Sequence, residues 1–270
     1  MLSNKLNLLN KLLNTRKVKA FRYIDDQKIK SLINFFVPKI IDDLKLIRIG
    51  NQNDGGYLVP DILDKIKYCF SAGVGHTNKF ESDLYKLQIK SFLADFSVEK
   101  STRDLEKFNF LKKYISSYDS EKTKNINSWI TENINTQDLN STILKLDVEG
   151  SEYEILSAID ENILKDLKII IVEFHGLEMI GDENTNLIIN SIKNKLLNYF
   201  YVAHIHPNNC CGIHNVSKFK IPSVLEVTYL NKKNMKISDK NCKIPNELDK
   251  KNVSKKKDIT LPNYWFVNNS

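Results

Sequence analysis

Short apolar runs alternate with amphipathic patterns through most of the chain after residue 46. Seven of these runs are rich in β-branched and aromatic residues, as strands are, and they cover residues 67–72, 89–94, 109–116, 142–146, 168–174, 199–205 and 224–230. Helical periodicity lies between several of them, at residues 79–87, 151–159 and 187–197. This alternation predicts an α/β fold with a mostly parallel sheet and helices on both faces. The last two runs have no clear helix between them, so we expect one of these strands to be antiparallel.

The N-terminal part of the chain differs from this pattern. Leucines recur at helical spacing over residues 2–14, which predicts an amphipathic helix. This helix would pack on the main domain or on a second subunit of a homodimer, or else lie on a membrane surface. A second helix is expected over residues 26–45, with an interruption near Pro38. Residues 1–45 are therefore interpreted as an N-terminal helical extension.

The C-terminal part carries most of the excess positive charge. The net charge of the 270 residues is +7, and residues 231–257 contain ten lysines and three acids. Such a charge permits nucleic acid, anionic lipid or phosphorylated metabolites as partners. No aromatic side chains interleave with these lysines as base-stacking platforms, so we expect no nucleic-acid partner. Residues 231–270 are interpreted as a lysine-rich loop and a docking tail, because residues 261–267 are too aromatic to stay exposed.

Composition limits the remaining possibilities. Hydrophobic residues make up 41% of the chain, enough for one sizeable core in a main domain at residues 46–230. No apolar run approaches the roughly 18 residues that a membrane span needs. The four cysteines form no C-x-x-C pair, and the adjacent Cys210 and Cys211 are awkward disulfide partners. The pattern predicts a reducing compartment, the cytoplasm, and makes a zinc site unfavourable.

A glycine-containing loop follows the first predicted strand. Residues 71–75 read SAGVG, and glycines at such a turn let the backbone approach a ligand closely. Asp95 ends the second strand about 20 residues later, where an acid can accept hydrogen bonds from ribose hydroxyls. Asn78 stands where a dinucleotide-binding loop has its third glycine. A nucleoside cofactor without a pyrophosphate is therefore favoured.

Pairs of polar residues follow three of the later strands: Asp147 and Glu149, Glu173 and His175, and His204 and His206. Residues two apart on a strand share a face, and the carboxyl ends of parallel strands lie on one side of a sheet. Carboxylates there can hold a substrate, a sulfonium amino acid or a divalent cation, and a histidine can act as a general base. The plainer alternatives are structural histidines, and acids that only stabilise the start of a helix.

Residues 144–152, which read LKLDVEGSE, strongly resemble the signature of FkbM-type methyltransferases. The surrounding motifs occur in the same order: DGGY at 54–57, SAGVG at 71–75, Asp95, IVEFH at 171–175 and HPNN at 206–209. The resemblance covers about residues 47–230, so that residues 46–230 are expected to form a methyltransferase domain. The N-terminal helices and the lysine-rich tail lie outside it.

The resemblance implies a Rossmann-like class I methyltransferase fold with a seven-stranded sheet. It also implies S-adenosylmethionine (SAM) as methyl donor and O-methylation of a sugar or another small hydroxylated metabolite, in surface-polysaccharide or secondary-metabolite biosynthesis. A phosphorylated or phosphoramidate precursor of capsule modification is the alternative acceptor, which the basic charge suits. A nucleic-acid methyltransferase is less favoured, because residues 147–150 lack an aromatic-flanked motif such as NPPY, and a non-catalytic binding protein is the remaining alternative.

On this resemblance, the residues expected to bind the cofactor are Asp54, Tyr57, Ser71, Gly73, Val74, Gly75, Asp95, Phe96, Ser116 and Asp147. Ser71 departs from many class I enzymes, which carry an acid at that position. The residues expected to bind the acceptor are Glu149, His175, Asn208 and Asn209.

The expected catalytic residues are His206 or His175 as general base, with Asp147 and Glu173 orienting the acceptor or the histidine. A base of this kind typically accelerates a reaction by about 10²- to 10⁴-fold. No metal is expected. A divalent cation held by Asp147, Glu149 or Glu173 is the weaker hypothesis.

Overall fold

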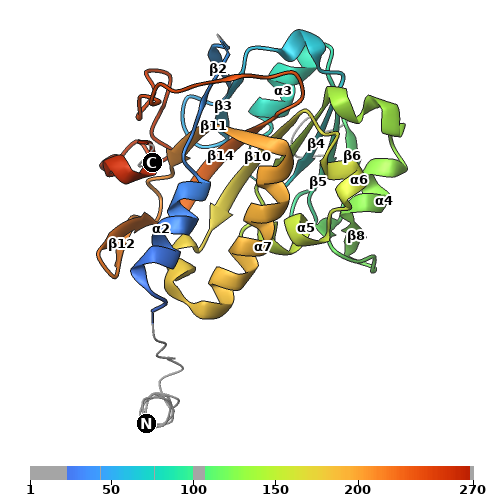
Figure 1. The fold of residues 1–270 in the computed structure, drawn as a ribbon. Helices are drawn as coiled ribbons and strands as arrows, with labels where there is room; N and C mark the ends of the chain where they lie inside the picture. The colour runs from blue at the N-terminus through green and yellow to red at the C-terminus, as the bar shows by residue number, and fades with distance from the viewer. Residues whose placement is uncertain (1–22, 43, 76, 100–106, 268–270) are drawn as a thin grey trace.

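Seven strands form one sheet at the centre of the fold (Figure 1). The computed structural model describes residues 23–42, 44–75, 77–99 and 107–267, so the helix predicted over residues 2–14 lies outside the described residues. The strands of the sheet are β4 (Tyr68–Ala72), β5 (Lys90–Ala94), β6 (Asn109–Leu111), β9 (Thr142–Leu146), β10 (Ile169–His175), β11 (Phe200–Pro207) and β14 (Val224–Asn231). Their order across the sheet is β11-β14-β10-β9-β4-β5-β6.

This topology confirms the predicted fold class. Numbered along the chain, the strands are ordered 3-2-1-4-5-7-6 from β6 to β11, the arrangement of a Rossmann-like methyltransferase sheet. Neighbouring strands are parallel except for β14, which is antiparallel to both β10 and β11. One of the last two strands is therefore antiparallel, as expected. The strand order reverses between β4 and β9, and ligands of open α/β sheets bind at such a point, outside the carboxyl ends of the strands.

Both faces of the central strands are buried, which explains their continuous apolar sequence. In β10, the side chains of Ile170, Val172 and Phe174 belong to one core, and those of Ile169 and Ile171 to the other. The helices that pack in the first core are α2 (Asp26–Phe35), α4 (Ile126–Thr131), α5 (Glu152–Ala158), α6 (Glu161–Leu164) and α7 (Glu183–Tyr199). The second core lies under α3 (Lys79–Lys86) and an antiparallel hairpin of β2 (Leu46–Gly50) and β3 (Gly56–Pro60).

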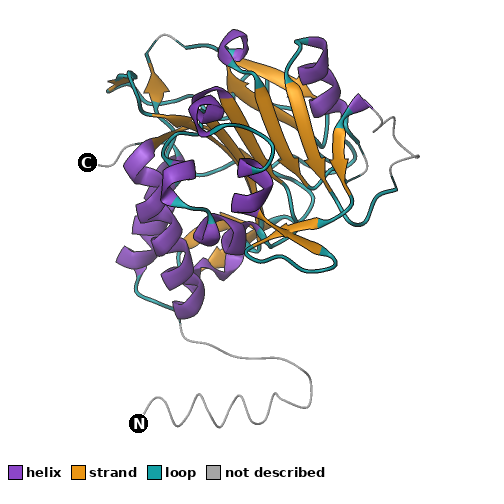
Figure 2. Cartoon of the chain, turned by 90° about the vertical axis from the view of Figure 1, so that its right-hand side faces the viewer, coloured by secondary structure: helices purple, strands orange, loops and turns teal. Residues whose placement is uncertain are grey.

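Smaller elements connect or flank the sheet, and Figure 2 shows them around its side-by-side strands. The short strands are β1 (Ile40–Ile41), β7 (Tyr114–Ser116), β8 (Thr123–Asn125), β12 (Ile213–Val216), β13 (Phe219–Pro222) and β15 (Ile237–Ser238). The 3₁₀ helices are η2 (Leu63–Lys65), η5 (Thr136–Ser141), η6 (Leu177–Gly181) and η7 (Asn263–Trp265). No helix within the described residues is long and apolar enough to cross a membrane.

Two predicted elements are shorter than expected. The helix that begins at Asp26 ends at Phe35, because Pro38 disfavours helical geometry before it and supplies no backbone N–H. The chain then forms β1, which pairs with β15 in the C-terminal part. The strand expected over residues 109–116 is broken after Leu111, where the Lys113 N–H donates back to the Leu111 carbonyl at 2.8 Å. Only its first half joins the sheet.

The C-terminal segment packs onto the main domain near α2. Trp265 is fully buried, its ring lies 6.0 Å from that of Phe36, and its Nε1–H donates to the Lys220 carbonyl at 3.0 Å. Closer to the sheet, Asp249 accepts a hydrogen bond from His204 of β11 at 2.8 Å. The tail therefore packs against side chains of β11, whereas the Lys39 N–H, next to β1, donates to the Val202 carbonyl of this edge strand at 2.8 Å.

We expect Trp265→Ala to destabilise the protein by about 3–5 kcal/mol, because the substitution leaves a large cavity among buried side chains. Urea denaturation followed by circular dichroism would measure the free energy of unfolding. Leu187→Ala is the control, since that side chain is 64% exposed and its loss should cost no more than about 0.5 kcal/mol. Equal effects of the two substitutions would show that the tail does not stabilise the fold.

Candidate active site

A cavity of about 980 Å³ opens at the carboxyl ends of β4, β5, β9 and β10. It lies at the reversal of strand order, where the fold class places its ligands. The predicted site residues that line it are Asp54, Gly73, Val74, Gly75, Asp95, Asp147, Glu149, Glu173, His175 and Asn208. The topology therefore brings together residues that are up to 154 positions apart in the sequence, as in the contact between Asn208 and Asp54.

The loop after β4 is held by the acid at the end of β5. One carboxylate oxygen of Asp95 accepts from the Val74 and Gly75 N–H groups at 3.0 and 3.1 Å, and the other accepts from the Ser97 N–H and hydroxyl. Burial raises the pKa of Asp95, but these hydrogen bonds outweigh it and the pKa lies below its usual value. Asp95 thus stays ionised and shapes the loop. A ribose hydroxyl can bind it by taking the place of the Ser97 hydroxyl.

The residues of this loop fit an adenosyl ligand. Gly75 has φ +54 and lines the cavity, and nothing lies within 4 Å of where its Cβ would be, so the backbone faces open space. Gly73 has φ +80, and a Cβ there would lie 1.7 Å from the Asp147 carbonyl oxygen. The first glycine is needed for close packing of β4 against β9, and the second leaves room for a ligand.

The two glycines should therefore respond differently to alanine. In Gly73→Ala the new Cβ would force a residue with a side chain into a left-handed conformation and would collide with the Asp147 carbonyl. We therefore expect the free energy of unfolding to fall by about 2–6 kcal/mol. Gly75→Ala meets only the backbone penalty, about 1–2 kcal/mol. Thermal denaturation of both variants would measure the difference. Equal destabilisation would contradict the close approach of β4 and β9.

A buried lysine that the sequence analysis did not identify lies beneath the cavity. Lys145 of β9 donates to the Gly73 carbonyl at 3.0 Å, and its Nζ lies 3.8 Å from carboxylate oxygens of both Glu81 and Asp147. Burial lowers the pKa of Lys145, but Glu81 and Asp147 outweigh burial and raise it. Ser71 donates to Glu81 at 2.6 Å. Only the polar lysine within the apolar run 142–146 could have signalled this cluster.

Asp147 and Glu173 are linked through Tyr57. The Tyr57 hydroxyl donates to Asp147 at 2.8 Å and lies 3.4 Å from Glu173, whose other oxygen accepts from the Asn208 amide at 2.8 Å. Burial, followed by repulsion from Asp147, Glu226 and Asp54, raises the pKa of Glu173 well above its usual value. Tyr57 and Asn208 thus hold the Glu173 carboxyl in place in a site where burial and neighbouring acids disfavour its ionised form.

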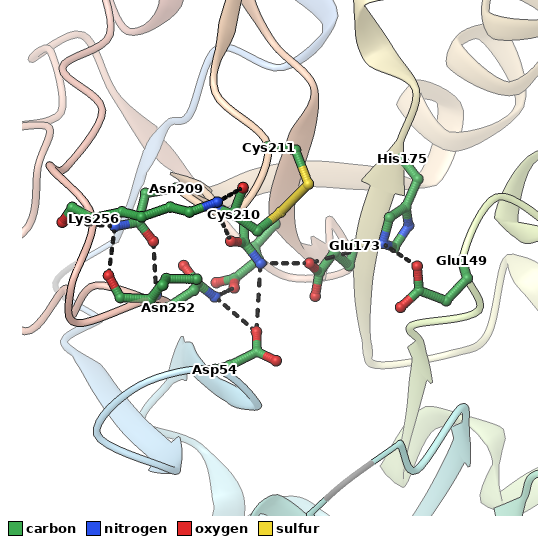
Figure 3. Close-up of a disulfide and its surroundings, with 12 residues drawn as sticks. Asp54, Glu149, Glu173, His175, Asn209, Cys210, Cys211, Asn252 and Lys256 are labelled. Atoms are coloured by element: carbon green, nitrogen blue, oxygen red, sulfur yellow. Dashed lines mark hydrogen bonds and ion pairs between the residues drawn. A yellow bond between two sulfur atoms is a disulfide. The ribbon is translucent and has the colours of Figure 1, made fainter.

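His175 closes β10 at the cavity wall, and α5 holds it there. The backbone N–H of His175 donates to the Glu152 carboxylate at 2.6 Å, and its backbone carbonyl accepts from the Tyr153 hydroxyl at 2.8 Å. The ring lies between two acids. Its Nδ1 is 3.5 Å from Glu152. Its Nε2 is 3.5 Å from Glu149, a pair that Figure 3 shows. Burial lowers the pKa of His175, but the carboxylates outweigh it and the pKa is raised.

The structure places His206 away from the cavity and buries it against the C-terminal tail. Its Nε2 lies 3.2 Å from the Asn252 side-chain oxygen, and its Nδ1 lies 3.7 Å from Asp249. Burial lowers the pKa of His206, but Asp249 and Glu226 outweigh it and raise the pKa to about 9. The reason is topological, because β14 separates β11 from β10. His206 does not line the cavity, so His175 is the better placed of the two candidates for the base.

Five other predicted site residues lie behind or outside the cavity lining. Tyr57 and Ser71 are fully buried one layer behind it and act through Asp147 and Glu81. Phe96, Ser116 and Asn209 do not line the cavity. The Phe96 ring is tilted against that of Tyr114, Ser116 donates to Glu154, and Asn209 forms hydrogen bonds with the backbone of Val253.

The C-terminal tail contributes to the site without any local sequence signal. Asn252 donates to Glu226 at 2.6 Å and to Asp54 at 3.2 Å, and Val253 lines the cavity. Burial raises the pKa of Glu226 to about 7. The tail thus connects β14 to the DGGY turn at 54–57, which nothing in the polar residues 231–260 indicates.

The expectation that Cys210 and Cys211 do not pair is wrong. The structure joins them in a disulfide on the cavity wall (Figure 3). The turn after β11 allows this, because the Cys210 N–H donates to the Asn208 side chain at 2.8 Å and Gly212 adopts a left-handed φ of +84. The cysteines therefore no longer argue for a reducing compartment.

Two groups of side chains have ligand atoms within 4.8 Å of one another, the spacing of a metal site. One is Asp147, Glu149 and His175, and the other is Asp54, Glu173 and Glu226. All of the first group lines the cavity, and so do Asp54 and Glu173 of the second, whereas Glu226 is buried behind them. The second group is internally bonded through Asn208 and Asn252, as expected for a hydrogen-bonded carboxyl cluster.

A seven-stranded sheet in this order, with a glycine loop, an acid after the second strand and a cavity between them, defines a Rossmann-like methyltransferase fold. The model of the methyltransferase FkbM domain matches residues 51–205, more than half of the chain. The chain therefore belongs to the FkbM methyltransferase family.

Similar solved structures are distant. A putative rRNA-methylase from Clostridium thermocellum is 13% identical with a TM-score of 0.37, over 63% of this chain and 90% of that one. A putative hemolysin from Streptococcus thermophilus is 12% identical with a TM-score of 0.33, over 79% of this chain and 68% of that one. No curated protein sequence matches the chain.

Proposed function

We propose that this chain is a SAM-dependent O-methyltransferase that acts on a hydroxyl group of a small, uncharged or cationic acceptor such as a sugar unit. The cavity carries the proposal, because it joins the Gly73–Gly75 loop and Asp95 to Asp147, Glu173 and His175 in one space. Surface-polysaccharide or secondary-metabolite biosynthesis is the setting we propose for this activity.

The charge of the cavity favours this acceptor over a phosphorylated one. Six acids are among the described lining residues (Asp54, Glu81, Asp95, Asp147, Glu149 and Glu173), and Lys145 is the one lysine or arginine among them. Lys145 already lies close to Glu81 and Asp147. A phosphate or phosphoramidate group would therefore meet repulsion, in spite of the basic charge of the whole chain. Nucleic acid is disfavoured for the same reason.

SAM would supply an electrophilic methyl group when bound. The backbone of the Gly73–Gly75 loop and Asp95 would bind the adenosyl part. His175 would accept the proton of the acceptor hydroxyl, for which its ring must be neutral. Glu152 is the carboxylate nearest Nδ1, at 3.5 Å and without a hydrogen bond to it. Its negative charge would favour the proton on Nδ1, which would leave Nε2 as the accepting atom. Positioning of the reacting groups supplies much of the acceleration in reactions of this type, on the order of 7 kcal/mol or more.

The pH dependence follows from the raised pKa of His175. Neutral His175 is present above its folded-state pKa and is lost as the pH falls, so kcat/KM should fall about tenfold per pH unit on the acid side. The midpoint should lie above the usual 6.5, since the nearby carboxylates outweigh burial. In Glu152→Gln one of these carboxylates is gone, and the acid limb should move to lower pH. A limb that does not move would contradict this role of Glu152.

Methyl transfer from labelled SAM tests the proposed acceptor class. Matched pairs of sugars, identical except for one phosphate group, would be compared by kcat/KM. We expect the unphosphorylated member to react at least about tenfold faster, equivalent to 1.4 kcal/mol. A consistent preference for the phosphorylated member would favour the anionic acceptor instead.

A further inference from the structure

The cysteine pair on the cavity wall has no role in the proposed methyl transfer. Cys210 is half-buried and Cys211 is exposed, and both line the cavity beside Glu173 and His175 (Figure 3). Their position differs from that of Cys69, which is fully buried and unbonded. A dissolved reagent can therefore reach the pair through the cavity, whereas Cys69 is protected.

Hydrogen bonds connect the backbone of Cys210 to Glu173 in the cavity wall and to the C-terminal tail. The Cys210 N–H donates to the side-chain oxygen of Asn208, whose amide nitrogen donates to Glu173. The Cys210 carbonyl accepts from the Lys256 ammonium at 2.5 Å. A change in the backbone at Cys210 is thus transmitted to a buried carboxyl of the site by a single intermediate side chain.

We propose that Cys210 and Cys211 form a reversible dithiol–disulfide modification site that reacts with low-molecular-weight disulfides, and that its state positions Asn208. Bonding between neighbours closes a small ring that includes their peptide group, so the disulfide restricts this backbone and the dithiol releases it. The modification is independent of methyl transfer. Only its consequence for acceptor binding rests on the proposed function.

A small disulfide can oxidise the Cys210–Cys211 dithiol by thiol–disulfide exchange. One cysteine thiolate attacks the reagent, forms a mixed disulfide and releases the first small thiol. The neighbouring thiolate then attacks the protein sulfur of the mixed disulfide, which forms the Cys210–Cys211 bond and releases the second small thiol. The protein loses two electrons and two protons, and the reagent gains them. An excess of a dithiol such as dithiothreitol reverses both steps.

The first experiment counts thiols in the full-length chain. Protein reduced with dithiothreitol, and then freed of it, is treated with oxidised glutathione, alkylated and mapped by peptide mass spectrometry. We expect both Cys210 and Cys211 to lose their free thiols without retaining glutathione. In Cys211→Ser the remaining Cys210 should keep a glutathione adduct, because nothing resolves it. Unreacted thiols, or a stable adduct on the wild-type pair, would overturn the proposal.

The second experiment measures the link to the site by hydrogen exchange. The amides of residues 208–212 and 249–257 should exchange severalfold faster in the dithiol form than in the disulfide form. The double variant Cys210→Ser/Cys211→Ser should be unaffected by either reagent. Identical exchange in both forms of the wild type would refute the link to Asn208. Loss of methyl transfer in both forms would count against the proposed function and leave this result standing.

Discussion

Replacing His175 by glutamine should lower kcat by about 10²- to 10⁴-fold, the usual contribution of a general base. Of the described histidines, only His175 lines the cavity, and its ring is held between Glu152 and Glu149. Glutamine keeps a polar side chain of similar reach but cannot take up the proton. Single-turnover kinetics with saturating SAM would separate this loss from slower binding.

His206→Gln is the matched comparison, because both histidines were candidates for the base. That substitution removes a buried cation paired with Asp249, so it should lower stability while the folded protein keeps most of its kcat. A folded His206→Gln variant that loses activity, beside a His175→Gln variant that keeps it, would reverse the assignment.

Asp95→Ala should weaken the binding of SAM by about 100-fold or more. The substitution removes the acceptor of four hydrogen bonds within the loop, and one hydrogen bond to a charged group contributes about 1.5–3 kcal/mol. The Val74 and Gly75 amides would then no longer be fixed at the cavity wall. Calorimetric titration of the variant with SAM would measure the change in Kd.

Ser97→Ala is the control for Asp95. It removes one donor to the carboxylate and leaves the bonds to Val74 and Gly75, so the affinity for SAM should change by less than about threefold. If Asp95→Ala binds SAM as tightly as Ser97→Ala does, Asp95 has neither of the roles that we assign to it.

Much of the fold could be predicted because the central strands have a strong local signal. Strands β9 and β10 are mostly apolar on both faces. Asp147 follows β9 directly, His175 is the last residue of β10, and both line the cavity. The β2–β3 hairpin was not predicted. Its strands have only five residues each, β2 contains Arg48 and β3 ends at Pro60, so neither gives a clear strand pattern. They cover a face of the sheet that only the tertiary fold creates.

The remainder of the site depends on contacts between distant segments. His204 and His206 lie two positions apart at the end of a strand, as Glu173 and His175 do. However, β14 lies between β11 and β10, and the tail packs against His204 of β11. Asn252 reaches Asp54 across 198 positions of sequence. Such contacts have no local pattern, so sequence periodicity can identify the strand ends but not which of them share a cavity.

The most direct test of the central claim is a calorimetric titration of the wild-type chain with SAM. We expect one site per chain with a Kd in the micromolar range, equivalent to about −8 kcal/mol. Absence of binding to folded protein, with the fold verified by circular dichroism, would contradict the proposal that this chain is an active methyltransferase.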